Sequence, residues 1–327
     1  MFQTSDGCQT KKIESPSSDV ISCTPNVSYS YGDTVDFRII VLTFNRPDSL
    51  LKLLTTLNTL ELDEHQSAAL EIFIDRNKRN ELHTETVETA KNFSWKINGT
   101  KRVYVWRTHV GLYGNWIDSW RPKPNSNEIA LILEDDLSVS PYALRWLKAA
   151  HNRYGTRDDI QGYTLTSGPM TGHAIGGKAI KIDKSDSAFL YRVLGSFGFS
   201  PHPKIWREFQ DWFHKAVKDT AFHPYVPNTL MDVWYRGFEK KGTQDTMWTM
   251  WFVWYTNKHN LYCVYNNIHE IAGVKNTYLV EHRHEPGIHY GGKAAKHAQN
   301  LLSEWKDVYI NFPLKTKKVD FKGNIVS

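Results

Sequence analysis

Short apolar runs and amphipathic segments alternate through the first half of the chain. Residues 37–44 form a mostly apolar run of strand length, and leucines recur at helical spacing directly after it, from Leu50 to Leu60. A buried parallel strand reads as a continuous apolar run, whereas an amphipathic helix repeats its apolar face every three or four residues. The pattern therefore predicts a strand followed by a helix that packs on the sheet.

The same alternation continues as far as residue 154. Further strands are predicted at 70–75, 102–106 and 129–133, and helices at 80–92, 115–120 and 141–154. Strands that alternate with helices at this spacing indicate a parallel sheet covered on both faces. The predicted fold class is therefore α/β, with a mostly parallel central sheet flanked by helices in a single catalytic domain.

The second half is less regular. It contains predicted strands at 161–166, 189–194 and 261–265, predicted helices at 203–218 and 245–257, and a glycine-rich loop at 168–177. Residues 1–35 are rich in Ser, Thr, Asp and Gly and are expected to form a flexible leader or stem. Residues 311–327 are expected to be a peripheral basic tail.

Composition and charge narrow the possible functions. The 327 residues are 40% hydrophobic and 23% charged, which is ordinary for a globular protein. The net charge is +5 with Lys and Arg spread along the chain, whereas a nucleic-acid-binding protein clusters its basic residues on one face. A mild positive field instead suits a diphosphate ligand. Aromatic residues make up 13% of the chain, which fits a bulky core and, in part, surfaces that stack on sugars.

Cysteines and short sequence signals bear on the cellular compartment. The three cysteines are Cys8, Cys23 and Cys263, which argues against a disulfide framework or a zinc ribbon and leaves a Cys8–Cys23 bridge open. Three sequons, at Asn26, Asn92 and Asn98, would matter only in a secretory lumen. The sequence shows no apolar run of transmembrane length and no signal-peptide core. We expect either a cytosolic protein or a chain without the membrane anchor of its relatives.

The strongest chemical feature is the acidic triplet Glu134-Asp135-Asp136 at the end of the predicted strand 129–133. Three adjacent carboxylates at the mouth of a buried strand repel one another unless a cation lies between them. Mg²⁺ and Mn²⁺ bind such oxygens and leave other coordination positions to water and phosphates. A solvated acidic turn ahead of the helix at 141 is the alternative.

Four segments of the chain resemble one enzyme family. Residues 134–141, Glu-Asp-Asp-Leu-Ser-Val-Ser-Pro, resemble the Asp-x-Asp segment of GT-A fold glycosyltransferases, in the form found in N-acetylglucosaminyltransferase I-type and related family-2 enzymes. Residues 41–47 resemble the first strand and the following Arg. Residues 74–76 resemble the second-strand Asp that contacts uracil, and residues 109–112 the Asn-x-Gly-Leu segment, with His109 at the Asn position. The likeness covers roughly residues 36–150.

This resemblance implies a metal-dependent, inverting glycosyltransferase, either a hexosyl- or an N-acetylhexosaminyl-transferase. It would move a sugar from a UDP-linked donor to a hydroxyl of a glycan or protein acceptor, with Mn²⁺ or Mg²⁺ as cofactor. Residues 36–155 would form the nucleotide-sugar-binding half and residues 156–310 the acceptor-binding, catalytic half. Relatives of this type lie in the Golgi lumen behind an N-terminal anchor, and the sequons agree with a secretory location.

The resemblance also assigns roles to individual residues. Asp136 is the expected metal ligand, although which acid of the triplet binds the metal stays open. The expected donor contacts are Thr43, Asn45, Arg46, Asp75, Gly111, Asn115, Glu134 and Asp135.

An inverting transferase also needs a general base for the acceptor hydroxyl. The family places an Asp at the start of a late helix, and Asp245 fits that position, with Gln244 in place of the acid that relatives often carry. Simple helix capping by Thr243 or Asp245 is the alternative. Asp211 is the competing candidate for the base.

Residues 281–289 are rich in metal-ligating side chains. Because some family members add a late His to the metal shell, His282 is the expected second ligand, with His284 as an alternative. A lid over the donor phosphates, with Arg283 and Lys293 reaching them, and an inert surface loop also remain open. A structural zinc site is disfavoured because no pair of cysteines accompanies these histidines.

Two other classes of protein are alternatives to the transferase. A sugar-nucleotide-forming nucleotidyltransferase would carry a glycine-rich loop after its first strand, and residues 43–47 contain no glycine. A non-catalytic carbohydrate-binding protein with the same fold stays open. The tryptophans Trp248, Trp251 and Trp254, three residues apart, are expected to pack in the core, with a sugar-stacking wall as the alternative.

Overall fold

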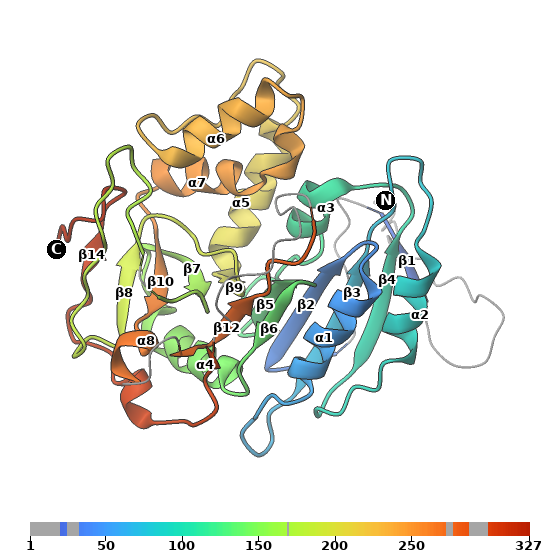
Figure 1. Cartoon of the computed structure of the whole chain (residues 1–327), viewed down its shortest axis with the longest axis horizontal. Coiled ribbons are helices and arrows are strands. Elements are labelled where there is room, and N and C mark those ends of the chain that lie inside the picture. The colour runs from blue at the N-terminus through green and yellow to red at the C-terminus, as the bar shows by residue number, and fades with distance from the viewer. Residues whose placement is uncertain (1–19, 25–32, 169, 273–276, 288–299) are drawn as a thin grey trace, which may run out of the picture.

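One ten-stranded sheet runs through the protein in this computed structural model, which describes residues 20–24, 33–168, 170–272, 277–287 and 300–327 (Figure 1). The strand order is β1-β4-β3-β2-β5-β9-β7-β10-β8-β14. The strands are β1 (Val20–Cys23), β2 (Phe37–Thr43), β3 (Ala68–Ile74), β4 (Lys101–Trp106), β5 (Ile129–Glu134), β7 (Ile160–Thr164), β8 (Ala188–Tyr191), β9 (Phe199–Pro201), β10 (Tyr262–Asn266) and β14 (Lys318–Val319).

The N-terminal half of the sheet is parallel throughout. β2 pairs in parallel with β3 and with β5, and β4 pairs in parallel with β3 and with β1. Beyond β5 the sheet is mixed, because β9 runs antiparallel to β5 and β7, and β8 runs antiparallel to β10. The predicted fold class, α/β with a mostly parallel sheet flanked by helices, is confirmed.

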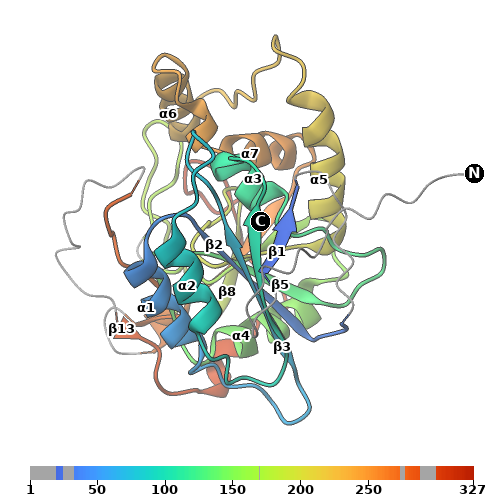
Figure 2. The same cartoon turned by 90° about the vertical axis from the view of Figure 1, so that its right-hand side faces the viewer.

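Helices cover both faces of the sheet, as Figure 2 shows for α1 and α2 on one side and α5 on the other. The first face carries α1 (Pro47–Leu57), α2 (Thr84–Asn92) and α4 (Ala143–Tyr154). The second face carries α3 (Gly111–Ile117), α5 (Pro203–Ala216), α6 (Leu230–Glu239) and α7 (Thr249–Lys258). All seven residues of β2 are buried, which explains why its sequence reads as an apolar run without alternation.

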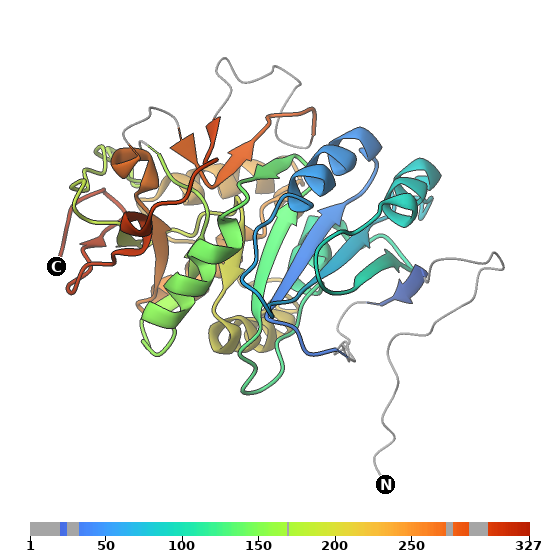
Figure 3. The ribbon, with the colours of Figure 1, turned by 90° about the horizontal axis from the view of Figure 1, so that it is seen from below.

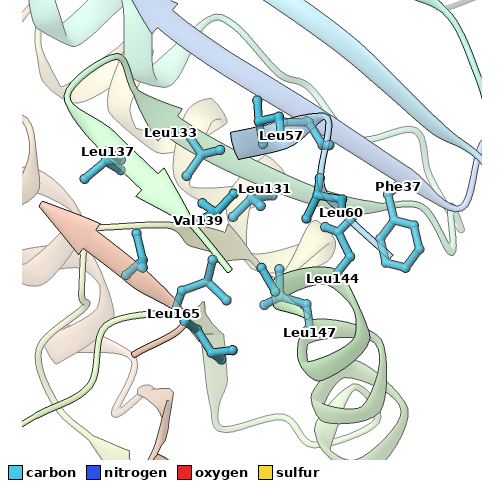
Figure 4. Packing of buried hydrophobic residues seen from close by; sticks show 14 of the residues in the cluster. Phe37, Leu57, Leu60, Leu131, Leu133, Leu137, Val139, Leu144, Leu147 and Leu165 are labelled. Carbon is cyan, nitrogen blue, oxygen red and sulfur yellow. The ribbon is translucent and has the colours of Figure 1, made fainter. Parts of the chain in front are cut away.

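Side chains from β2 divide between two cores. Ile39 and Val41 pack with α1 and α4, whereas Ile40 and Leu42 pack under α3 and α5. Figure 4 shows the first core, where leucines of β5, α1 and α4 meet. Each fully buried leucine of this kind contributes about 1.5–3 kcal/mol through its removal from water.

Two small sheets and three short helical segments complete the described chain. β6 (Leu137–Val139) pairs antiparallel with β12 (Val280–His282), and β11 (Thr277–Tyr278) pairs in parallel with β13 (Asn300–Leu301). The short helical segments are α8 (Ile268–Ile271), η1 (Gln244–Thr246) and η2 (Asp307–Ile310). The β6–β12 pair lays a late segment of the chain directly beside the acidic triplet.

The sheet extends further towards both chain ends than predicted. Residues Val20–Cys23, assigned to the leader, form β1, and Lys318–Val319, assigned to the peripheral tail, form β14. Cys23 and Val319 are fully buried, so both segments belong to the folded body. Figures 1 and 3 show these two strands at opposite ends of the sheet. Cys8 and Asn26 lie outside the described residues, and so does any Cys8–Cys23 bridge.

Three predicted helices begin about four residues from the predicted start. α3 begins at Gly111 and not at residue 115. α2 begins at Thr84 and not at residue 80, because the side chain of Asn77 accepts hydrogen bonds from the N–H groups of Arg79 and Glu81 and holds this stretch in a turn. The predicted helix at 245–257 begins at Thr249, and a separate turn of 3₁₀ helix contains Asp245. None of the helices in the described ranges combines the length and apolarity needed to cross a bilayer.

Candidate functional site

The carboxyl ends of three neighbouring strands bring the predicted site residues together. β2 ends at Thr43 and lies between β3, which precedes Asp75, and β5, which ends at Glu134. Because these strands are parallel, their carboxyl ends share one edge of the sheet, the usual place for ligands in α/β proteins. These residues are distant in sequence, and they become neighbours because of the order of the strands in the sheet.

Asp135 lies at the centre of this edge and is only 2% exposed. Its Oδ2 accepts a hydrogen bond from the Thr43 hydroxyl (2.6 Å), and its Oδ1 forms an ion pair with the Arg46 guanidinium. Burial raises the pKa of Asp135 to about 6, although the charge of Arg46 and the Thr43 hydrogen bond act to lower it. Two predicted donor-binding residues therefore hold a third in place.

Glu134 is turned towards the second face of the sheet. Its Oε1 accepts a hydrogen bond from the Trp116 indole nitrogen at 2.9 Å. Burial, together with the charge of Asp136, raises the pKa of Glu134 to about 7. The triplet thus stores negative charge that costs free energy, and a ligand carrying positive charge would relieve that cost.

Asp136 has the properties expected of a metal ligand. Its Oδ2 lies 3.0 Å from Arg46 Nη1 and 3.6 Å from His282 Nε2. Burial acts to raise the pKa of Asp136, but His282 and Arg46 outweigh it and hold this pKa below its usual range. Its other oxygen, Oδ1, is buried and has no hydrogen-bond partner among the described residues.

These residues fit a divalent cation bound through two protein side chains. Ligand atoms about 2.1 Å from one ion can lie as far as about 4.2 Å apart, so Asp136 Oδ2 and His282 Nε2 could share an ion. No group of three or more His, Cys, Asp or Glu side chains in the described part of the chain is placed to hold a metal. Water and phosphate oxygens would have to supply the remaining ligands.

His282 is positioned by strand pairing and by ring contacts. It lies opposite Leu137 in the β6–β12 ladder, next to Asp136. Its ring stacks on Phe197 with centroids 4.4 Å apart and planes 5° apart, and the His284 ring contacts it edge-on at 4.3 Å. His282 therefore meets the acidic triplet directly, and the ring of His284 lies against that of His282. His289 and Lys293 lie outside the described residues.

Arg283 anchors the turn that contains the acidic triplet, residues 134–136, through several hydrogen bonds. Its guanidinium donates to the backbone carbonyls of Ser49, Asp135 and Leu137, and to the carboxylate of Glu285. The backbone N–H of Arg283 also donates to the carbonyl of Asp136 at 2.9 Å. In this arrangement the side chain binds protein acceptors and does not extend over the site as the lid interpretation required.

Replacing Arg283 with lysine should lower the free energy of unfolding by about 2 kcal/mol, because three ammonium donors cannot serve the acceptors that five guanidinium donors reach. Urea denaturation of the variant would measure this loss. The exposed Arg79→Lys is the matched control and should stay within about 0.5 kcal/mol of the wild type. An unchanged unfolding midpoint would contradict the anchoring role.

Asp75 connects β3 to the start of α3. Its two carboxylate oxygens accept the backbone N–H groups of Val110 (3.0 Å) and Gly111 (2.9 Å), and His109 Nδ1 lies 3.2 Å away. Burial raises the pKa of Asp75, against the lowering effect of these hydrogen bonds. Gly111 has φ +64°, a conformation that glycine adopts without strain. A hydrogen bond that Asp75 accepts from the uracil of a donor would add to the two that Asp75 already accepts from the backbone.

The remaining predicted donor contacts differ in accessibility. Asn45 is exposed in the turn before α1. Asn115 is buried on α3, and its Oδ1 accepts the Trp106 indole N–H at 2.9 Å. A donor contact by either residue stays a prediction.

Asp245 lies in the exposed η1 turn, close to α3. Tyr113 of α3 donates a hydrogen bond to the carbonyl of Gln244 at 2.7 Å, and Trp116 stacks on Trp248 with centroids 4.4 Å apart. Trp116 thus contacts Glu134 on one side and the residue preceding α7 on the other. No side chain caps α7, so the capping interpretation is wrong for Thr243 and for Asp245.

The other late acid and the tryptophans have structural contacts. Asp211 is 58% exposed and forms an ion pair with Arg121 at 2.8 Å. Trp248 and Trp251 are buried in the second core, as predicted, and Trp254 stacks on Trp212 with centroids 4.9 Å apart.

Solved structures of S. aureus TarS are similar to this chain. The structures of TarS 1-349 alone and in complex with UDP match with a TM-score of 0.36 and 13% identity, covering 72% of this chain and 62% of theirs. The complex with UDP-GlcNAc matches with a TM-score of 0.32 and 14% identity, covering 61% of this chain and 53% of that one. The chain thus spans less than two thirds of the TarS chain. No protein-family model and no curated protein matches it.

A likeness at these TM-scores supports no inference about function, so the site has to be argued from its own residues. Sequence reasoning missed four of them: Ser49, Trp116 and Phe197, and the anchoring role of Arg283. Their side chains touch the acidic triplet or its histidine only through tertiary contacts, and no spacing in the sequence signals them.

Proposed function

We propose that this chain is a glycosyltransferase that moves a sugar from a UDP-linked donor to a hydroxyl group of a glycan or protein, with inversion at the anomeric carbon. The observation that carries the proposal is the acidic cluster at the sheet edge, where Asp136 retains a buried oxygen without a hydrogen-bond partner in the described chain. The four segments that resemble GT-A glycosyltransferases, which supply this edge, support it further.

The proposed donor site uses the residues around Arg46. Asp136 and His282 would hold Mn²⁺ or Mg²⁺, which when bound would stabilise the negative charge that grows on the departing diphosphate. Arg46 is about a quarter exposed and bridges Asp135 and Asp136, so its guanidinium can also face phosphate oxygens. The pocket for the ribose and the sugar would be shaped by Thr43, Glu134 and Asp135. The remaining predicted donor contacts would surround the uracil: Asn45, Asp75, Gly111 and Asn115.

Asp245 is the proposed general base. As the bond between the anomeric carbon and the phosphate oxygen breaks, the acceptor oxygen bonds to that carbon and its proton passes to the Asp245 carboxylate. UDP leaves with the electron pair. No described residue hydrogen-bonds to this carboxylate, so its oxygens are available to an acceptor hydroxyl.

The alternative is a non-catalytic carbohydrate-binding protein with the same fold. Arg46 pairs with two of the three acids, and Asp75 binds two backbone amides, so these side chains already have protein partners that a donor would have to share. Incubation with UDP-sugars separates the two functions, because only the transferase releases UDP.

Replacing Asp136 with alanine should weaken Mn²⁺-dependent UDP binding by about 100-fold, because the expected metal loses its only carboxylate ligand. Isothermal titration of UDP into the wild type, with Mn²⁺ and then with EDTA, gives the reference. Asp211→Ala removes an exposed carboxylate far along the chain and should leave the affinity unchanged. Equal binding in EDTA would refute the metal, and no binding in either condition would refute the UDP donor.

A further inference from the structure

A cavity opens beside Asp245, on the face of the sheet that carries α5, α6 and α7. Its volume is about 410 Å³, within the range of about 300–1,000 Å³ typical of small-molecule sites. Its walls come from α3, from the loop after α5, from α6, from η1 and from α7. The lining residues are Tyr113, Val217, Asp219, Thr220, Phe222, His223, Tyr235, Glu239, Gln244, Asp245 and Trp251.

One wall of this cavity is aromatic and held rigidly. Tyr113 donates to the carbonyl of Gln244 at 2.7 Å and accepts the Trp251 indole N–H at 3.1 Å. Phe222 packs on Trp251 with centroids 5.6 Å apart. Trp251 is buried, whereas Phe222 and Tyr113 remain partly exposed to the cavity. A fixed aromatic surface of this kind is complementary to the apolar face of a sugar ring.

The charged side chains that line the cavity are negative, and His223 is the lining side chain that becomes positive when it is protonated. Asp219, Glu239 and Asp245 are carboxylates, and the described residues that line the cavity include no lysine or arginine. Both oxygens of Glu239 are occupied, by His223 Nδ1 at 2.8 Å and by the Tyr225 hydroxyl at 2.6 Å. Asp219 accepts the N–H of Ala221 at 3.0 Å. Asp245 is therefore the lining carboxylate that accepts no hydrogen bond from any described residue.

We propose that this cavity binds the acceptor, and that the acceptor is a sugar without negative charge, either neutral or amine-bearing. Its ring lies against Phe222 and its reacting hydroxyl lies at Asp245. A carboxylated, sulfated or phosphorylated sugar would be repelled by the three carboxylates of a cavity whose described lining includes no lysine or arginine. This inference rests on the proposed transferase function for the reaction at Asp245, but the binding preference can be measured without any transfer.

A glycan array probed with the whole protein, with and without UDP and Mn²⁺, tests the preference directly. Neutral or amino sugars should bind, and their uronic-acid or phosphorylated counterparts should bind at least about tenfold more weakly in titrations of matched pairs. A preference for acidic sugars, or no binding to any glycan in either condition, would overturn the inference. UDP binding without glycan binding refutes the acceptor cavity alone, whereas glycan binding without UDP binding refutes the transferase alone.

Two variants connect the preference to named residues. Phe222→Leu keeps the apolar volume and removes the stacking surface, so it should weaken binding of the best neutral glycan about tenfold and leave UDP binding unchanged. The double variant Asp219→Asn, Glu239→Gln should narrow the discrimination between matched neutral and acidic glycans by about tenfold. A merely structural effect would weaken both glycans alike and leave their ratio unchanged, which would contradict the charge argument.

The control for the charge variant is Asp211→Asn. This substitution removes a carboxylate from α5, the helix that precedes the loop with Asp219, at a position outside the cavity lining. It should leave both the affinity and the ratio as in the wild type. If Asp211→Asn also narrowed the ratio of the affinities for neutral and acidic glycans, the discrimination would come from the overall charge of the surface. That result would overturn the role of the cavity.

Discussion

Replacing Asp245 with asparagine is expected to slow sugar transfer by about 10²- to 10⁴-fold, the usual contribution of a general base. Asparagine keeps the size and polarity of the side chain but cannot take a proton from the acceptor hydroxyl. UDP affinity should stay within about twofold of the wild type, because the proposed donor contacts lie on other elements. Initial rates of UDP release, with UDP titrations on the same protein, measure both quantities.

The comparison variant for this experiment is Asp211→Asn, which removes the competing candidate for the base. Asp211 is bound to Arg121 on the surface, so its loss should change the rate little. If Asp245→Asn transferred sugar at the wild-type rate while Asp211→Asn did not, the base would be Asp211. If both variants were active, the proton would have to leave by another route, and the proposed mechanism would be wrong.

The interior of the fold could be predicted because burial on both faces leaves a plain signal. β2, β3 and β5 are buried apolar runs, and α1 and α4 repeat their leucines at helical spacing, so each was found within a few residues. The strands that were missed are the short ones. β14 has two residues, too few to show a period, and β1 has four. The place of both strands is fixed by pairing with distant strands.

The same distinction applies to the site. The triplet at residues 134–136 was predicted because three acids directly follow a buried strand, and strand order then places Asp75 and Thr43 nearby. The pairing of β12 with β6 joins segments about 140 residues apart, so the position of His282 followed from resemblance and its orientation by Phe197 was not predictable. The sequence left open a lid in which Arg283 reaches the donor phosphates, but the guanidinium of Arg283 donates to the turn that it anchors.

Substituting Arg38 with methionine is expected to lower the free energy of unfolding by about 3–5 kcal/mol, the usual cost of removing one partner from a buried ion network. Arg38 lies on β2 and is fully buried. Its guanidinium binds Glu71 at 2.6 Å, Glu128 through two hydrogen bonds of 2.7 and 2.8 Å, and Asp33 at 3.2 Å. Methionine fills a similar volume. The decrease in the free energy of unfolding therefore measures the cost of leaving these carboxylates without the charge of Arg38.

Urea denaturation at neutral pH measures this loss. Lys91→Met is the control, because it breaks the exposed pair with Glu88 on α2, and it should cost less than about 1 kcal/mol. A loss for Arg38→Met no larger than for this control would show that the network contributes little to stability.

The pH dependence of that loss separates charge from packing. Burial raises the pKa of Glu71 to about 7, although Arg38 and Arg102 act to lower it. An unfolded glutamate titrates near about 4.3, so the folded chain binds the proton more tightly, and stability falls as the pH rises between these values. Without Arg38 the pKa of Glu71 rises further and the fall continues above pH ~7.

The difference in stability between the wild type and Arg38→Met should therefore be larger at pH ~8 than at pH ~5. Asp33 and Glu128 also face the guanidinium. The charge of Arg38 helps to lower the pKa of Asp33, so losing that charge raises this pKa, which acts in the same direction. Arg102 remains beside Asp33 and Glu71 and limits the effect. A loss that is independent of pH would instead come from imperfect packing of the methionine, because a cavity does not bind protons.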